Sequence, residues 1–118
     1  MLNKIKNDMG TITIEREVIA RIAGLAATEG YGVVGMAAKN VRDGLVHLLK
    51  KESLSKGVRV HINEKGLIIN LYIIVEYGTN IGAIADTLKS NVKYHVEDKV
   101  GLPVDEVNIF VEGVRLGR

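Results

Sequence analysis

Apolar and polar residues alternate most regularly between residues 57 and 77, and this pattern predicts two neighbouring β-strands. The run Gly57-Val-Arg-Val-His-Ile62 alternates, and Leu67 to Tyr77 is dense in β-branched and aromatic residues, which favour strands. Between them, Asn63-Glu-Lys-Gly66 is typical of a turn. We therefore expect this strand pair to organise the fold.

A helix and a last strand are expected after this pair. Apolar residues recur at helical spacing from Ile81 to Val100, and Pro103 cannot continue that helix. Val104 to Val114 alternates again and predicts a strand. Alternation divides the apolar residues of this strand between two sides, with Val107, Ile109 and Val111 on one and Phe110 and Val114 on the other.

The first half of the chain carries a less regular pattern. Met9 to Ile14 alternates Thr with Ile and predicts a short strand, and a helical apolar pattern then runs from Glu15 to Gly30. We expect a glycine-punctuated loop at Tyr31–Gly35, either a helix or a loop at residues 36–40, and a short helix at Asp43–Lys51.

These elements predict an α+β fold in the order β-α-(α)-β-β-α-β. The helices are expected to cover one face of a small mixed sheet, which makes a two-layer sandwich. Residues 1–8 are polar and are expected to be a flexible N-terminus, while residues 9–118 are expected to form one domain.

Composition and charge are those of an ordinary globular protein. The net charge of +2 is too small to indicate nucleic acid or anionic lipid as a partner. The chain contains no cysteine, so thiol catalysis and thiolate metal sites are excluded. Neither a membrane-spanning run nor a signal peptide is recognised, so the expected location is cytoplasmic.

No catalytic or cofactor-binding pattern stands out. His47, His61 and His95 fall in three different elements, whereas a zinc site needs several converging ligands. Phosphate-binding glycine motifs and a nucleophile elbow are also missing from the sequence. The residues therefore indicate a protein that is not an enzyme and that has no cofactor and no metal.

One glycine motif offers an RNA-binding alternative. Gly32-Val33-Val34-Gly35 is a G-x-x-G between an expected helix and the segment that is either a helix or a loop. If that segment is a helix, the arrangement resembles the K-homology module, whose GXXG loop clamps a nucleic-acid backbone. Its two central valines cannot meet phosphate, although Lys39 and Arg42 nearby could compensate. The other interpretation is that the glycines permit positive φ and the valines pack.

The side of the sheet away from the helices carries more apolar residues than a fully solvated sheet face usually does. By alternation, Ile68, Tyr72, Ile74 and Phe110 lie on that side. Two interpretations stay open: residues 36–50 cover these side chains, or the side chains form a protein–protein interaction face.

Five passages of the chain resemble the alkaline shock protein family of Gram-positive bacteria, the envelope stress response proteins, and in particular its small YloU-like members. The passages are Gly10–Ile14, Tyr31–Met36, Ser55–Val60, Leu71–Ile81 and Gly101–Val114. Such a resemblance implies a non-enzymatic interaction or scaffold protein linked to envelope stress or to regulation of lipid metabolism. It also implies self-association and a protein partner, either membrane-anchored or of lipid metabolism, without insertion of this chain into the membrane.

Overall fold

Strand β4 (Gly66–Glu76) is the centre of the structure, a computed structural model that describes residues 9–39, 46–48 and 51–116. Strand β3 (Val58–Asn63) pairs antiparallel with the first half of β4, and β5 (Val104–Arg115) pairs parallel with almost its whole length. The sheet is therefore mixed, as expected.

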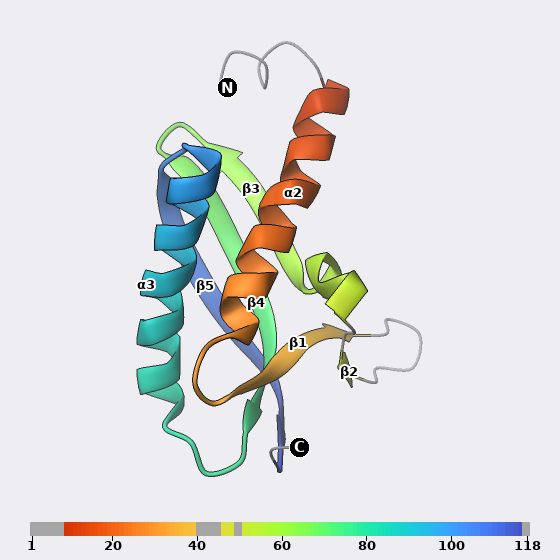
Figure 1. Cartoon of the computed structure of the whole chain (residues 1–118), viewed down its shortest axis with the longest axis vertical. Helices are drawn as coiled ribbons and strands as arrows, with labels where there is room; N and C mark the ends of the chain where they lie inside the picture. The colour runs from red at the N-terminus through yellow and green to blue at the C-terminus, as the bar shows by residue number, and fades with distance from the viewer. Residues whose placement is uncertain (1–8, 40–45, 49–50, 117–118) are drawn as a thin grey trace.

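Two more strands complete the sheet. β1 (Val33–Lys39) pairs antiparallel with the last residues of β4, and the short β2 (Val46–Leu48) pairs with β1. Because β5 occupies one edge of β4, β1 and β3 share the other edge, one after the other along the strand. Figure 1 shows β1 crossing the end of the sheet and β5 lying beyond β4.

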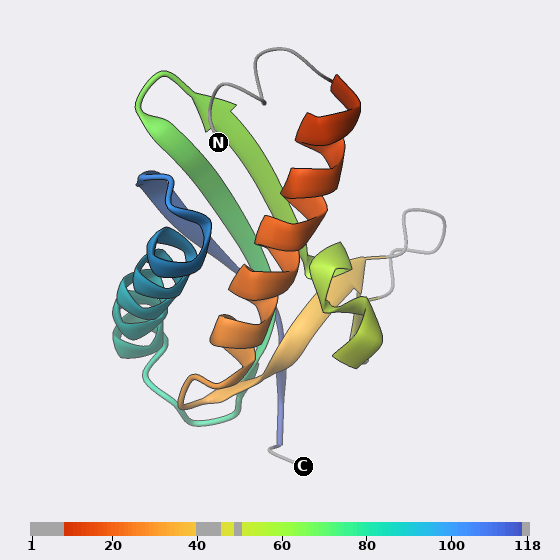
Figure 2. The same cartoon turned by 45° about the horizontal axis from the view of Figure 1, so that its top comes forward.

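Both long helices lie on the same face of this sheet. Helix α2 (Met9–Thr28) and helix α3 (Ile81–Val100) run side by side over it, with the short 3₁₀-helix η1 (Lys51–Gly57) beside α2 (Figures 1 and 2). Beneath them, every odd-numbered residue of β4 from Leu67 to Val75 is buried. Packing these residues against the helices buries the main apolar core.

Local chemistry explains where α3 begins and ends. The Asn80 side chain accepts a hydrogen bond of 3.0 Å from the backbone N–H of Ala83, which is an N-cap. At the other end Gly101 adopts the left-handed conformation, with φ of 82°, and its N–H donates to the Glu97 carbonyl. The Glu97 carboxylate accepts from the Val104 N–H at 2.8 Å and so connects the helix end to β5.

The structure confirms the α+β fold class, and the second half of the chain follows the predicted elements closely. β3, β4, α3 and β5 appear where the apolar pattern placed them, within one or two residues at each end. The observed order is α-β-β-η-β-β-α-β rather than β-α-(α)-β-β-α-β, because the first half differs.

The predicted strand at Met9–Ile14 is wrong, since these residues are the first turns of α2. No glycine or proline separates Ile14 from the helical pattern that follows. Extending a helix that has already nucleated is easier than forming a six-residue strand without a neighbour. Glu15 and Glu17 therefore lie within the helix and not at its beginning.

The expected loop and helices at residues 31–51 are also wrong where the structure describes them. Only the first part of Tyr31–Gly35 is a turn, and β1 takes the rest and continues through residues 36–39. Of the predicted helix Asp43–Lys51, residues 46–48 form strand β2. Pairing with β4 and β1 decides these segments, and a pattern within one segment cannot indicate that pairing. The remainder of that helix and the expected flexible residues 1–8 lie outside the described residues.

Candidate functional site

The sheet face opposite the helices is the candidate site, and we call it the open face. Its members come from three strands and follow from the register of each with β4. They are Arg59 and His61 of β3, Ile68, Asn70, Tyr72, Ile74 and Glu76 of β4, and Glu106, Asn108, Phe110, Gly113 and Arg115 of β5.

An aromatic stack lies at the middle of the open face. Tyr72 and Phe110 are cross-strand neighbours, and their rings stack with centroids 5.0 Å apart and an angle of 15° between planes. Stacking of this kind contributes about 0.5–1.5 kcal/mol beyond area burial. Phe110 nevertheless stays 41% exposed and Tyr72 half-buried. The open face thus presents an ordered aromatic surface to its surroundings.

Polar neighbours frame this stack. The Asn108 amide donates to the Asn70 side-chain oxygen at 2.9 Å, one cross-strand pair before Tyr72 and Phe110. Glu106 lies beyond them on β5 and is exposed. This cross-strand bond satisfies one polar atom of each amide beside the stack.

Ile74 differs from the other apolar residues predicted for this face. Its side chain is fully buried, whereas Ile68 and Tyr72 keep part of their surface. The register places glycines on both sides of it, Gly35 of β1 and Gly113 of β5. The exposed apolar surface of the open face therefore consists of Ile68, Tyr72 and Phe110, while Ile74 is covered.

A bulge corrects the predicted side of Val114. The register between β4 and β5 shifts between Ile73 and Ile74, so Glu112 is an extra residue on β5. Val114 consequently lies beside Val75 on the helix side of the sheet and does not share the face of Phe110. Alternation cannot reveal such an inserted residue.

The Gly32–Gly35 segment does not form a loop between helices. Gly32 adopts φ of 83° in a tight turn, and its carbonyl accepts a 2.8 Å hydrogen bond from the Glu76 N–H. Val33 to Gly35 are the first residues of β1. The helix–loop–helix arrangement behind the K-homology alternative is therefore absent at this segment. Lys39 ends β1, and Arg42 lies outside the described residues.

The structure does not bring the histidines together. His61 is exposed on β3 beside Ile68, His95 is half-buried on α3, and His47 belongs to β2. Within residues 9–39, 46–48 and 51–116, no three His, Asp or Glu side chains are placed to hold a metal ion.

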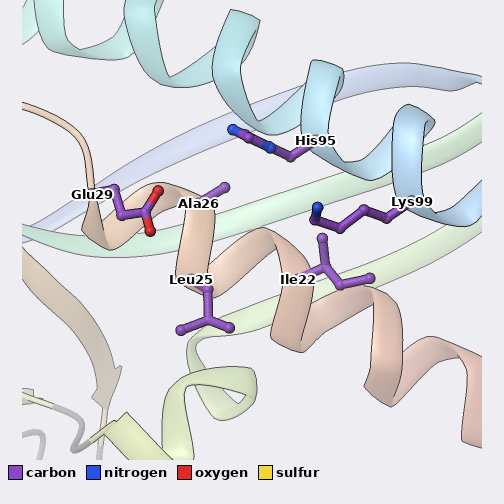
Figure 3. Close-up of a pocket in the computed structure, with 6 residues that line it drawn as sticks. All are labelled: Ile22, Leu25, Ala26, Glu29, His95 and Lys99. Carbon is purple, nitrogen blue, oxygen red and sulfur yellow. The ribbon is translucent and has the colours of Figure 1, made fainter.

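A groove of about 370 Å³ runs between α2 and α3, on the helical side of the molecule. Ile22, Leu25 and Ala26 form its apolar lining, Glu29 directly follows α2, and His95 and Lys99 come from α3. Figure 3 shows the Glu29 carboxylate and the His95 ring pointing toward the space between the helices. Sequence patterns did not indicate this groove, because it forms only where two helices distant in the chain pack together.

The described part of the chain holds no helix long and apolar enough to cross a bilayer.

Comparison with known proteins gives a consistent result. The model of the ASP23 family, described as "cell envelope-related function", matches residues 4–116, and this is the alkaline shock protein family that the sequence resembles. The uncharacterized protein YloU of Bacillus subtilis is 47% identical over 114 residues, which are 96% of this chain and 95% of YloU. The uncharacterized protein YqhY of the same organism is 33% identical over 107 residues, covering 91% of this chain and 78% of YqhY.

A longer relative carries a functional name. The stress response regulator gls24 homolog of Streptococcus pyogenes is 33% identical over 109 residues, which are 90% of this chain and 59% of the relative. No solved structure matches the chain.

Proposed function

The chain belongs to the alkaline shock protein family, whose function is related to the cell envelope, and from that premise we propose that it is a non-enzymatic interaction protein that works through its open face. In this proposal the open face binds a second copy of the chain and a protein partner of the envelope stress response. Regulation of lipid metabolism is the alternative setting for the same contact.

The stacked pair Tyr72 and Phe110 is the observation that carries this proposal. The two rings stack on each other, yet Phe110 remains 41% exposed. Aromatic side chains at the centre of a surface patch commonly dominate binding energy, because they bury a large area and lose little side-chain entropy. An ordered, uncovered aromatic pair is therefore a good anchor for a protein partner.

Position and charge extend the proposal. The open face is mainly polar around its apolar centre, with Asn70, Asn108 and Glu106 beside the stack, as is typical of reversible protein contacts. We propose a cytoplasmic location, with attachment to the membrane only through a membrane-anchored partner. The name of the gls24 homolog supports a place in the stress response.

The substitution Tyr72→Glu tests the proposal. A carboxylate at the centre of the open face should weaken association by about tenfold or more, because it must be desolvated there without a partner. Light scattering of the purified chain and the yield of cross-linked partner from native lysate measure the two contacts.

The matched control is Tyr94→Glu, since Tyr94 is 66% exposed on α3, away from the open face. Circular dichroism should show an unchanged fold for both variants. If Tyr72→Glu keeps the assembly and the cross-linked partner at wild-type levels, the open face is not the binding surface.

A further inference from the structure

The outer edge of β5 offers a second contact surface. β4 occupies one edge of this 12-residue strand, and no strand in the described part of the chain pairs with the other edge. Phe110 is 41% exposed, Val114 51% and Leu116, just past the strand, 79%. A long strand edge presents unpaired N–H and C=O groups, and the groups that satisfy them best belong to another strand.

The open-face residues of β5 are complementary to themselves. Position along β5 is best counted on β4, because that register already accounts for the bulge at Glu112. Phe110 is opposite Tyr72, while Glu106 is opposite Ile68 and Arg115 is opposite Glu76. Their β4 partners Ile68 and Glu76 each lie four residues from Tyr72. Along β5, Phe110 is therefore midway between the acidic Glu106 and the basic Arg115.

A two-fold axis at Phe110 uses this symmetry. In an antiparallel pair of β5 strands centred there, Glu106 of each copy lies beside Arg115 of the other, and the two Phe110 rings are neighbours. Opposite charges and aromatic pairs both stabilise cross-strand contacts. A parallel pair in the same register would place Glu106 beside Glu106, which is unfavourable.

The helix side of β5 matches under the same operation. The β4 partners of Val107 and Val114 each lie three residues from Tyr72, the partner of Phe110. The partners of Ile109 and Val111 each lie one residue from Tyr72. The axis at Phe110 therefore pairs valine with valine and isoleucine with valine. These four apolar residues therefore meet one another, which adds hydrophobic burial to the backbone hydrogen bonds.

We infer that two copies of this chain join edge to edge through antiparallel β5 strands, about a two-fold axis at Phe110. This deepens the self-association in the proposed function and rests on it. Pairing of this kind is isologous and closed, so it gives a dimer and not a filament. It also merges the two open faces into one surface, with both Tyr72–Phe110 stacks at its centre.

Charge reversal tests the pairing in the full-length chain. Glu106→Arg and Arg115→Glu should each raise the dissociation constant of the dimer about tenfold, because each places like charges together at two symmetric positions. The double variant should return to within about threefold of wild type. Sedimentation velocity over a concentration series measures all three.

The rescue is informative because the two residues cannot interact within one chain. Eight β4 positions separate Glu106 from Arg115, or about 26 Å along the strand. Asp86→Arg and Lys89→Glu, at exposed positions of α3, make the same charge changes away from β5. These controls should dimerise like wild type.

A cysteine pair gives a direct readout, since the native chain contains no cysteine. Phe110→Cys should form an intermolecular disulfide under mild oxidation, because directly opposite residues across a strand pair lie close together. Tyr72→Cys should not, because three strand spacings, about 14 Å, separate the two copies of that position.

Three results would overturn the inference: a wild-type chain that is monomeric at every concentration, single reversals that dimerise normally, or a double variant that is not rescued. If dimers resist the reversals but dissociate in Tyr72→Glu, the copies meet through their open faces, and the proposed function survives without the edge pairing. If the rescue holds while Tyr72→Glu still captures its partner, the edge pairing survives and docking on the open face fails.

Discussion

Because Gly66 has no side chain, the beginning of β4 can lie close to Pro103, which is distant in the sequence. Gly66 adopts φ of 139°, and a Cβ built there would run into the carbonyl oxygen of Pro103. The same carbonyl accepts a 2.9 Å hydrogen bond from the N–H of Leu67. One residue at the beginning of β4 therefore lets the segment between α3 and β5 approach closely enough to start the parallel pairing.

Gly66→Ala is expected to destabilise the fold more than Gly78→Ala. Both glycines have positive φ, but an added Cβ at Gly78 meets nothing within 4 Å, so that variant isolates the backbone strain of about 1–2 kcal/mol. Gly66→Ala carries a larger backbone strain, because φ of 139° is accessible essentially to glycine alone, and it also displaces Pro103, so we expect about 3 kcal/mol or more. Urea unfolding of both variants measures the difference, and equal losses would show that the close approach is not needed.

Strand β4 is the element on which both layers depend. Its odd-numbered side chains are buried under α2 and α3, and its even-numbered ones form the middle of the open face. Strands pair with both of its edges. The alternation seen in the sequence thus separates a buried side, which stabilises the fold, from the open-face side, which we propose for contact.

Substitutions on the two sides of β4 should separate these tasks. Leu71→Ala removes a fully buried side chain from the core and should lower the free energy of unfolding by about 2–5 kcal/mol. Ile68→Ala removes a half-buried side chain from the open face, so we expect a loss below about 1.5 kcal/mol.

Thermal and urea unfolding measure stability in both variants, and light scattering measures association. Ile68→Ala should weaken association while it keeps the fold. Comparable losses of stability in the two variants would mean that the open face is part of the core.

At the scale of the whole molecule, the helices protect one face and leave the other face and one strand edge available. Both helices and the main core lie on the same side of the sheet (Figure 2). The open face and the outer edge of β5 meet at Phe110, so the two proposed contacts are continuous. A protein built this way exposes an ordered aromatic surface without weakening its own core.

Hydrogen exchange should reveal this layout. The amides of β4 should exchange most slowly, because strands flank both edges and helices cover one face. The outward amides of β5 should exchange much faster in dilute, monomeric protein and become protected as the concentration rises. Protection of β5 that does not change with concentration would argue against edge pairing, and fast exchange in β4 would argue against its central position.

Sequence patterns predicted the elements that stabilise themselves locally. The helix at Ile81–Val100 has its own cap at Asn80 and its own terminator at Gly101, and β4 carries a long β-branched run. The open-face residues Tyr72 and Phe110 followed from simple alternation in the two strands. The same reasoning was wrong at Val114, because of a bulge in β5, and at residues 33–39, because they pair with β4. Neither a bulge nor a neighbouring strand is visible in the local sequence pattern.

The sequence by itself determined that the chain folds as an α+β sandwich with a surplus of apolar residues on one sheet side, because period and propensity are properties of single segments. Tertiary structure alone decided which strands are neighbours: the parallel pairing of β4 with β5 stacks Tyr72 on Phe110 and centres Glu106 and Arg115 about that ring. Such a surface exists only when residues distant in the chain are fixed in register, since register depends on the packing of the whole molecule.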